Sequence, residues 1–318
     1  MKSRSKAVAY PGLPVVFAEG FRDVKRRISG HSHASLAITD LHEMAKTETA
    51  AELIPEGAYF TLNGMPASDA RAKAVSGVIH GMLALATDRT GVKLESVNHG
   101  ILTGSSDSGA AALVTALDDV LELGLPVPRL VELAKPVSET AYRSLVGGLS
   151  QCIVDRDGGL KVTALKKASF FRDMNIYAVA FDGVKRFSAD DLHTRVVNHK
   201  NYPKRPAEVD RRLEMLPKLL ERQDLVGFMH LMENEARTVH AMFSETGMEV
   251  IKPEMKAVTD IITGLRESGV EAFWNVAGGS AVYVFTLNKH AKEVTRELKN
   301  KNYRYRPFKV ADGAKAVI

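Results

Sequence analysis

The residues from Gly100 to Leu113 have types and spacings that could bind phosphate. They read Gly-Ile-Leu-Thr-Gly-Ser-Ser-Asp-Ser-Gly-Ala-Ala-Ala-Leu, after an extended stretch from Val92 to Asn98 and before apolar residues at helical spacing. A Gly/Ser turn between a strand and a helix presents backbone N–H groups at the positive end of the helix dipole, where anions bind. The turn lacks the Walker pattern and the dinucleotide fingerprint. The alternative is a structural turn in which Ser105, Ser106 or Asp107 caps a buried helix.

A second polar stretch, from Ser138 to Gly148, could bind a carboxylate. It reads Ser-Glu-Thr-Ala-Tyr-Arg-Ser-Leu-Val-Gly-Gly. The guanidinium of Arg143 matches a carboxylate in bidentate geometry. The alternative is the end of an amphipathic helix on which Arg143 is solvated. His31 and His33 could share a strand face as metal ligands do, but without a third ligand nearby we assign no transition metal.

Composition indicates an ordinary globular protein. The chain has 318 residues, of which 45% are hydrophobic and 25% charged, and no apolar run approaches the roughly 20 residues of a membrane span. The basic N-terminus is not followed by an apolar core, so a secretory signal is not expected. Cys152, the single cysteine, excludes an internal disulfide and fits a reducing compartment. We expect a cytoplasmic protein.

The formal net charge of +5 suggests an anionic ligand. The most basic stretch, Lys299 to Lys309, alternates cations with aromatic residues, a pattern that could stack on and neutralise single-stranded nucleic acid. The favoured interpretation is a solvated edge strand whose cations discourage edge pairing. No recognised nucleic-acid module accompanies the stretch.

The elements that must position these residues form two groups. In the first group, periodicity predicts strands over 6–18, 34–38, 58–62 and 92–98, and turn residues predict an Asn63-Gly64 turn and a hairpin of 149–155 with 160–165. Periodicity also predicts three helices: one from 69 to about 87, one that follows the Gly/Ser turn, and one from 127 through the Ser138 stretch. In the second, from about residue 168, it predicts strands over 175–181, 272–276, 281–287 and near Tyr303, and helices over 207–222, 225–245, 253–268 and from about 289. Strands mixed with helix pairs indicate a second α+β unit.

Together, the two polar stretches resemble motifs of the GHMP kinase superfamily. Gly-Ser-Ser-Asp-Ser-Gly-Ala-Ala resembles its Gly-Leu-Ala-Ser-Ser-Ala-Ala-Gly phosphate loop. The Ser138 stretch resembles the Ser-Gly-Ser-Ala-x-Arg-Ser-Leu-Phe-Gly-Gly signature of its diphosphomevalonate decarboxylase branch. The resemblance runs nearly end to end. It implies an α+β, two-lobed fold, with an N-terminal α/β lobe (1–167), a ferredoxin-like C-terminal lobe (168–318), and ligands in the cleft between them.

The resemblance also implies site residues. Ser106 would take part in catalysis and contact Mg²⁺, as the matching serine does in the family, and Asp107 could approach the metal. Arg186 resembles a catalytic arginine of the archaeal mevalonate 3-kinases and would stabilise the transferred phosphoryl group. Ser138, Thr140 and Arg143 would hold the substrate, together with the positions Glu139, Phe17 and Val276. The residues expected to bind ATP are Ser96, Asn98, Gly104, Ser105, Ser106, Asp107, Ser108 and Gly109.

Three departures from the decarboxylases change the expected chemistry. Phe17 stands where they carry a lysine, and Val276 stands where they carry a catalytic aspartate. Neither side chain can abstract a proton or neutralise a carboxylate. Glu139 replaces a glycine, and its charge would repel a phosphorylated substrate tail. The same departures, and the string from Asn98 to Ala111, resemble the archaeal mevalonate 3-kinases.

The resemblance therefore implies an enzyme that uses ATP and Mg²⁺ to phosphorylate the 3-hydroxyl of mevalonate in an archaeal isoprenoid route, without decarboxylation. Its other expected properties are a homodimer and no nucleic-acid or membrane partner. One alternative is a decarboxylase of a phosphorylated mevalonate: phosphomevalonate, diphosphomevalonate or mevalonate 3,5-bisphosphate. An alternative of another class is a nucleic-acid-binding protein that uses the basic C-terminus.

Overall fold

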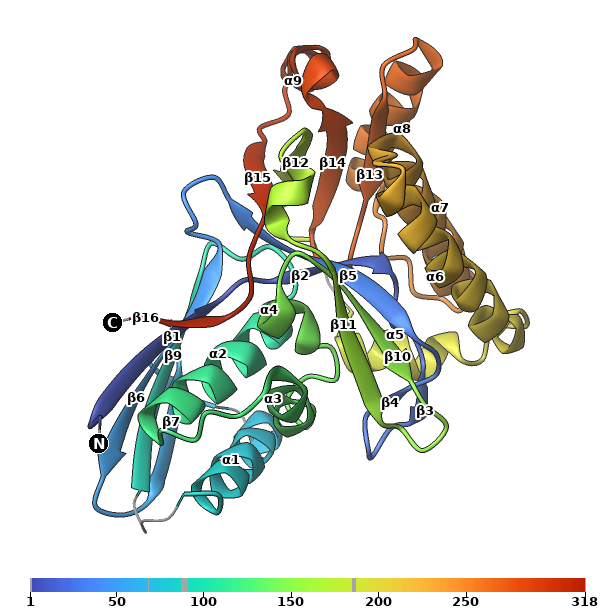
Figure 1. The fold of residues 1–318 in the computed structure, drawn as a ribbon. Helices are drawn as coiled ribbons and strands as arrows, with labels where there is room; N and C mark the ends of the chain where they lie inside the picture. Colours follow the sequence, from blue (N-terminus) through green and yellow to red (C-terminus); the bar gives the residue numbers. More distant parts are fainter. Residues whose placement is uncertain (1, 68, 87–90, 185–186, 318) are drawn as a thin grey trace.

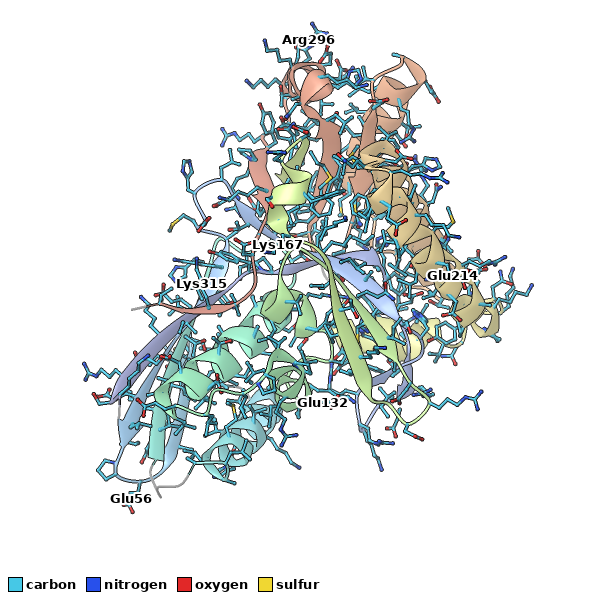
Figure 2. All side chains as sticks on the ribbon, viewed as in Figure 1. Glu56, Glu132, Lys167, Glu214, Arg296 and Lys315 are labelled. Atoms are coloured by element: carbon cyan, nitrogen blue, oxygen red, sulfur yellow. The ribbon has the colours of Figure 1, made fainter. Side chains whose placement is uncertain are left out.

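Two β-sheets organise the computed structural model, which describes residues 2–67, 69–86, 91–184 and 187–317 (Figure 1). The smaller sheet lies under a layer of helices in the first half of the chain. The larger sheet continues from the first half into the second. Charged side chains such as Glu214, Arg296 and Lys315 project outward from the fold (Figure 2). No helix of the described ranges is both long and apolar enough to cross a membrane.

The Gly/Ser turn follows β9 (Gly91–His99), an inner strand of the six-stranded sheet. The order of this sheet is β16 (Lys315–Val317), β1 (Arg4–Ala9), β6 (Lys46–Ile54), β9, β7 (Ala58–Leu62) and β8 (Met65–Pro66). Helices α1 (Asp69–Leu83), α2 (Ser105–Val120), α3 (Val127–Ala134) and α4 (Tyr142–Val146) lie in the layer beside it. Because its alanines are small and fully buried, α2 packs closely on β1 and β6.

The larger sheet has eight strands and joins the two halves. Its order is β11 (Leu160–Lys166), β10 (Leu149–Val154), β5 (His33–Asp40), β15 (Arg306–Val310), β12 (Met174–Ala180), β14 (Ala281–Leu287) and β13 (Ala272–Asn275), and β2 (Gly12–Val16) also pairs with β5. Around it lie the hairpin β3 (Phe21–Asp23) with β4 (Ile28–Ser29), and helices α5 (Ala189–Val196), α6 (Arg205–Glu221), α7 (Leu225–Glu245), α8 (Pro253–Glu267) and α9 (Ala291–Asn300). Short 3₁₀ turns cover Ala168–Phe171, Tyr202–Lys204 and Asn288–His290.

The expected mixed fold of helices and sheets is confirmed. A lobe boundary at residue 167/168 stays a prediction. The end of the chain crosses back over that boundary, because β15 pairs with β5 and β16 pairs with β1.

Several predicted elements are wrong in extent. The strand expected over 6–18 is two strands in different sheets, because the chain turns at Tyr10-Pro11 and proline has no N–H for a continuous ladder. The helix expected to run through the Ser138 stretch ends at Ala134, two residues before Pro136. The sequence analysis missed β6 and α5.

The basic C-terminal stretch is not an edge strand, so that interpretation is wrong. The last long strand is β15 rather than a strand near Tyr303, and it pairs with β5 on one side and β12 on the other. The aromatic residues around it pack inward: Tyr303 contacts Phe181, and Tyr305 contacts Tyr177. Both tyrosines belong to the partly buried side chains that pack against the apolar core of the second half.

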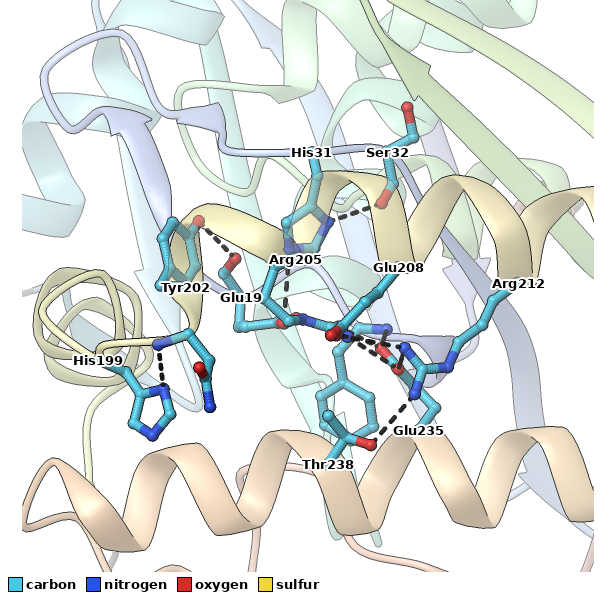
Figure 3. A network of polar contacts seen from close by, with 12 residues as sticks. Glu19, His31, Ser32, His199, Tyr202, Arg205, Glu208, Arg212, Glu235 and Thr238 are labelled. Atoms are coloured by element: carbon cyan, nitrogen blue, oxygen red, sulfur yellow. Dashed lines mark hydrogen bonds and ion pairs between the residues drawn. The ribbon is translucent and has the colours of Figure 1, made fainter.

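A buried charge network fixes the loop between β2 and β3 against the helices of the second half (Figure 3). Arg205, at the start of α6, is fully buried and donates from Nε to Glu19 Oε1 at 2.6 Å and from Nη2 to Glu235 Oε1 at 2.7 Å. The backbone N–H of Phe17 also donates to Glu235 Oε1, at 3.0 Å. Helices α6 and α7 and a loop that lies 186 residues before Arg205 are therefore joined by one guanidinium.

The network also sets protonation states. Burial by itself would raise the pKa of Glu19, but the charges of Arg205 and His31 outweigh it and lower that pKa to about 2. Burial disfavours the charged form of His31, yet Glu19, 3.5 Å from its Nε2, raises the pKa of His31. Glu19 is therefore ionised in the folded protein.

Replacing Arg205 should destabilise the fold strongly. Arg205→Met removes the cation that two buried carboxylates share and leaves Glu235 with Arg212 and Glu19 with His31 as their remaining partners, which costs about 3–5 kcal/mol of unfolding free energy. Lys256→Met is the matched control, because its ion pair with Asp260 is exposed and contributes less than about 1 kcal/mol. Urea denaturation measures both variants, and equal losses would contradict the assigned role of the network.

The stabilisation from Glu19 should disappear on acidification. A pKa of about 2 in the folded protein against 4.5 for an ordinary glutamate corresponds to about 3 kcal/mol, present above pH 4.5 and lost as the pH falls through about 2. The difference in unfolding free energy between wild type and Glu19→Gln should therefore shrink from pH 7 to pH 3. A difference that stays constant or grows over that range would show that Glu19 is not held ionised.

Candidate active site

At the Gly/Ser turn, the N-terminus of α2 has free backbone N–H groups and no capping side chain among the described residues. Helix α2 begins at Ser105, the preceding Gly104 has φ 67°, and no described side chain caps the helix. A Cβ on Gly104 would lie 2.6 Å from the carbonyl oxygen of Gly12, so only glycine fits there. The alternative in which a serine or Asp107 caps the helix is therefore wrong. The first N–H groups of α2 have no partners within the helix and stay available to an anion.

A cavity of about 640 Å³ extends from this loop to the second half of the chain. One side is formed by residues 101–107 and by the Ser138 stretch. The opposite side is formed by Phe17 to Glu19, by residues 187–193 at the start of α5, and by residues 277–279. A cavity of this size accommodates a nucleotide phosphate chain beside a small metabolite.

Asp107 joins the Gly/Ser turn to the Ser138 stretch. Its buried carboxylate accepts hydrogen bonds at Oδ1 from Thr140 Oγ1 at 2.6 Å and from Ser138 Oγ at 2.8 Å. Its Oδ2 accepts from Arg143 Nη1 at 3.3 Å. Burial raises the pKa of Asp107, although Arg143 and the two hydroxyls oppose that shift. Arg143 is buried rather than solvated, so the alternative of a solvated helix end is wrong.

Most of the predicted ATP residues lie around a second, smaller hollow of about 30 Å³ beside the loop. Ser96, Asn98, Ser105, Ser106 and Gly109 all line it, together with apolar side chains of the sheet and helices. Their role in ATP binding stays a prediction.

Ser108 is oriented differently from the other serines of the loop. It is fully buried, and its Oγ lies 2.7 Å from Thr47 Oγ1, toward β6. It lines neither of these two hollows. An ATP-binding role for Ser108 also stays a prediction.

Phe17 and Val276 are linked by His240, a residue that the sequence analysis missed. Phe17 lines the cavity, and its ring meets the edge of the His240 imidazole at 5.8 Å. The carbonyl oxygen of the fully buried Val276 lies 2.5 Å from His240 Nε2. Burial lowers the pKa of His240 to about 4, so this imidazole is neutral near pH 7. Two apolar side chains and a neutral ring therefore meet here. Val276 does not line the cavity, and the substrate-binding roles of Phe17 and Val276 stay predictions.

Glu139 is engaged by two residues that the sequence analysis also missed. Arg27, after β3, donates from Nε to Glu139 Oε2 at 2.8 Å, and His193 of α5 places Nε2 3.5 Å from Glu139 Oε1. Arg27 also pairs with Asp190 at 3.1 Å. All four side chains line the cavity.

Other predicted features fall outside the cavity or outside the described residues. Arg186 belongs to the undescribed pair 185–186, so its catalytic role stays a prediction. His33 contacts the hydroxyl of Tyr142 at 2.9 Å and His31 pairs with Glu19, so the two imidazoles serve different partners. Among the described residues, no group of three or more His, Cys, Asp or Glu side chains could hold a metal ion.

Comparison with known proteins gives consistent matches. Residues 9–163 match the family "Diphosphomevalonate decarboxylase-like N-terminal domain", and residues 188–301 match "Mevalonate-3-kinase, C-terminal domain". The chain is 30% identical to the mevalonate 3-kinase of Thermoplasma acidophilum, over 90% of this chain and 89% of the relative, and 26% identical to that of Picrophilus torridus, over 96% and 95%. The crystal structure of the Thermoplasma acidophilum enzyme with mevalonate 3-phosphate and ADP superposes with a TM-score of 0.90 at 24% identity, covering 100% and 99% of the two chains.

Removing the Ser106 hydroxyl should impair ATP use selectively. Ser106→Ala is expected to lower kcat/KM for ATP by about tenfold or more, the equivalent of one hydrogen bond to a charged group, with unchanged urea stability. Ser268→Ala is the matched control, because its exposed hydroxyl donates to the carbonyl of Gly264 away from both hollows and should leave ATP use unchanged. Unaltered ATP kinetics in Ser106→Ala would remove this serine from the site.

Proposed function

Since the chain belongs to the mevalonate 3-kinase family of the GHMP superfamily, we propose that it transfers the γ-phosphoryl group of ATP to the 3-hydroxyl of mevalonate and does not decarboxylate the product. One observation carries the second half of this statement. Phe17 and Val276 place no ionisable group where the decarboxylases hold a lysine and an aspartate, and the intervening His240 is neutral.

The phosphate loop would bind ATP through the N-terminus of α2. Positioning and charge neutralisation supply most of the catalysis in phosphoryl transfer, so preorganised donors matter more than a covalent step. The backbone N–H groups after Gly104 and the Ser105 and Ser106 hydroxyls are such donors. Arg186 would add a cation at the transferred group.

The donor set of the loop fits Mg²⁺. Ser106, and the nearby carboxylate of Asp107, offer the oxygen ligands that Mg²⁺ prefers. When bound with ATP, the ion neutralises negative charge on the phosphates. Asp107 also has a structural role, because its hydrogen bonds orient Ser138, Thr140 and Arg143.

Arg143 would hold the carboxylate of mevalonate. Its Nε has no hydrogen-bond partner within the described part of the chain, so the guanidinium keeps donors for a ligand beyond its contact with Asp107. A carboxylate paired with a guanidinium is stabilised in its ionised form. Loss of CO₂ would turn the electron pair of the broken C–C bond into a C=C bond while the C3–O bond breaks and the departing phosphate takes the negative charge, and the apolar Phe17 and Val276 offer no electrostatic help. The reaction should stop at the 3-phosphate.

Glu139 would select a substrate whose C5 end is not phosphorylated. Repulsion between a carboxylate and a nearby phosphate raises the free energy of binding by about 1–4 kcal/mol at effective dielectric constants of 80 to 20. A free hydroxyl could instead donate a hydrogen bond to Glu139. This separates the proposal from the first alternative, a decarboxylase acting on phosphorylated mevalonate.

The proposals that remain concern the compartment, the oligomeric state and the partners of the protein. Cys152 is a free, buried cysteine, which supports a reducing compartment, and we place the protein in the cytoplasm of an archaeon. We also propose a homodimer, testable by light scattering. The inward packing of Tyr303 and Tyr305 speaks against single-stranded nucleic acid as a partner.

Analysis of the reaction products tests the proposed function directly. The purified protein with ATP, Mg²⁺ and mevalonate should give one ADP per mevalonate consumed and a phosphate that phosphorus NMR places on the 3-oxygen. No CO₂ should be released, because nothing at Phe17 or Val276 can assist the departure of the carboxylate. Stoichiometric CO₂ from the wild-type protein would overturn this interpretation of the two residues.

A further inference from the structure

The carboxylate of Glu139 is already paired with a cation before any substrate arrives. Its side chain is 6% exposed and lies against Arg27, whose side chain is 24% exposed, with N–O contacts of 2.8 Å. Asp190 contacts the same guanidinium at 3.1 Å from the solvent side, where its own side chain is 62% exposed. A phosphate approaching Glu139 would therefore meet an arginine that is already occupied, rather than an isolated carboxylate.

Arg27 is held firmly in this place. It lies in the turn between β3 and β4 with φ 49°, a backbone conformation that few side chains adopt. Its guanidinium lies 5.1 Å from the centre of the Phe21 ring, and the His193 imidazole stacks on Phe21 with a centroid distance of 4.2 Å. The hairpin, the substrate motif and α5 thus build one polar end of the cavity around Phe21.

The balance of charge at this end is negative by one. Arg27 supplies one positive charge, and Glu139 and Asp190 supply two negative charges. Burial lowers the pKa of His193, so its imidazole adds no positive charge near pH 7. An arginine is the side chain best suited to a phosphate, because its planar donors match the phosphate oxygens. Here those donors are directed at two carboxylates.

We propose that Arg27 is a specificity-determining residue, and that Glu139 rejects a phosphorylated C5 end chiefly by occupying Arg27. This inference rests on the proposed function, because it concerns which form of the substrate enters the same site. In the wild type, a 5-phosphate would have to displace Glu139 from Arg27 and leave a carboxylate buried without a cation. A C5 hydroxyl can donate to Glu139 while the ion pair stays intact.

The proposal makes the effect of Glu139 depend on Arg27. Glu139→Gln frees the guanidinium, so the ratio of kcat/KM for 5-phosphomevalonate to that for mevalonate should rise by about 10- to 100-fold, the range of a charge-assisted hydrogen bond. The double variant Glu139→Gln with Arg27→Gln should lose most of this gain. Arg27→Lys in the Glu139→Gln background should restore part of it, because lysine keeps the charge but not the planar donors.

The control comes from the same hairpin. Arg26→Gln changes an exposed arginine whose Nη2 contacts the carbonyl of Asp157, away from Glu139, and the ratio should not change. A merely structural role for Arg27 would lower turnover of both substrates without altering their ratio. An equal gain in Glu139→Gln with and without Arg27 would overturn the proposal, because repulsion by Glu139 would then explain the selectivity alone.

Calorimetry separates this proposal from the proposed function. Binding of 5-phosphomevalonate to the wild type and the same variants, measured without ATP, tests the role of Arg27 even if mevalonate is not phosphorylated. Absence of 3-phosphate from the wild type would instead refute the kinase assignment. If Glu139→Gln does not fold, Glu139→Ala removes the same charge and gives the same comparison.

Discussion

Much of the active-site geometry depends on burying one guanidinium between two carboxylates. The loop that carries Phe17 and Glu19 has no ladder of its own between β2 and β3, so its position is determined by Arg205 and Glu235. Charges buried together in this way, with Arg212 beside Glu235 and His31 beside Glu19 as further partners, are stable only in one close arrangement, because any displacement weakens their pairing in a medium of low dielectric constant. The loop, α6 and α7 are thereby constrained to one another (Figure 3), and one side of the cavity takes a single form.

A second constraint acts within the opposite side of the cavity, through Asp107. This carboxylate belongs to the first turn of α2, yet its three donors come from the substrate motif. The nucleotide loop and the residues that would hold mevalonate are therefore positioned by one side chain. A shift of α2 by an ångström would disturb both sets together, which suits a reaction that needs the phosphate and the hydroxyl in line.

Local sequence signals predicted the elements that depend on local interactions. The Gly/Ser turn, the long helices α7 and α8, and the hairpin of β10 with β11 were recognisable because turn residues and periodicity mark them. Strand β6 was not recognisable, because it opens with Lys-Thr-Glu-Thr and so places polar residues on both of its faces. Its burial comes from α2, which packs on it. The end of α3 depended on Pro136, a signal that was present and missed.

The residues of the candidate site likewise divide into those that a sequence motif reveals and those that only the tertiary fold brings together. Arg143 and Glu139 lie in a recognisable motif, whereas Arg27, His193 and His240 lie far from any motif and reach the cavity only through the tertiary fold. Single charged residues on a short hairpin carry no spacing signal. The partner of Asp107 was likewise hidden, because a polar residue in a first helical turn ordinarily suggests a cap.

The return of β16 to β1 has a consequence for how the protein is made. Residues 315–317 complete the sheet that carries the phosphate loop, and residues 306–310 fill a gap between β5 and β12 in the other. Neither sheet can close while the ribosome still holds those residues. Until residues 306–317 are available, β1 and β5 each keep an open edge, which is the kind of surface most prone to aggregation. The last step of folding therefore joins strands that lie far apart in the sequence, and both sheets depend on that step to close.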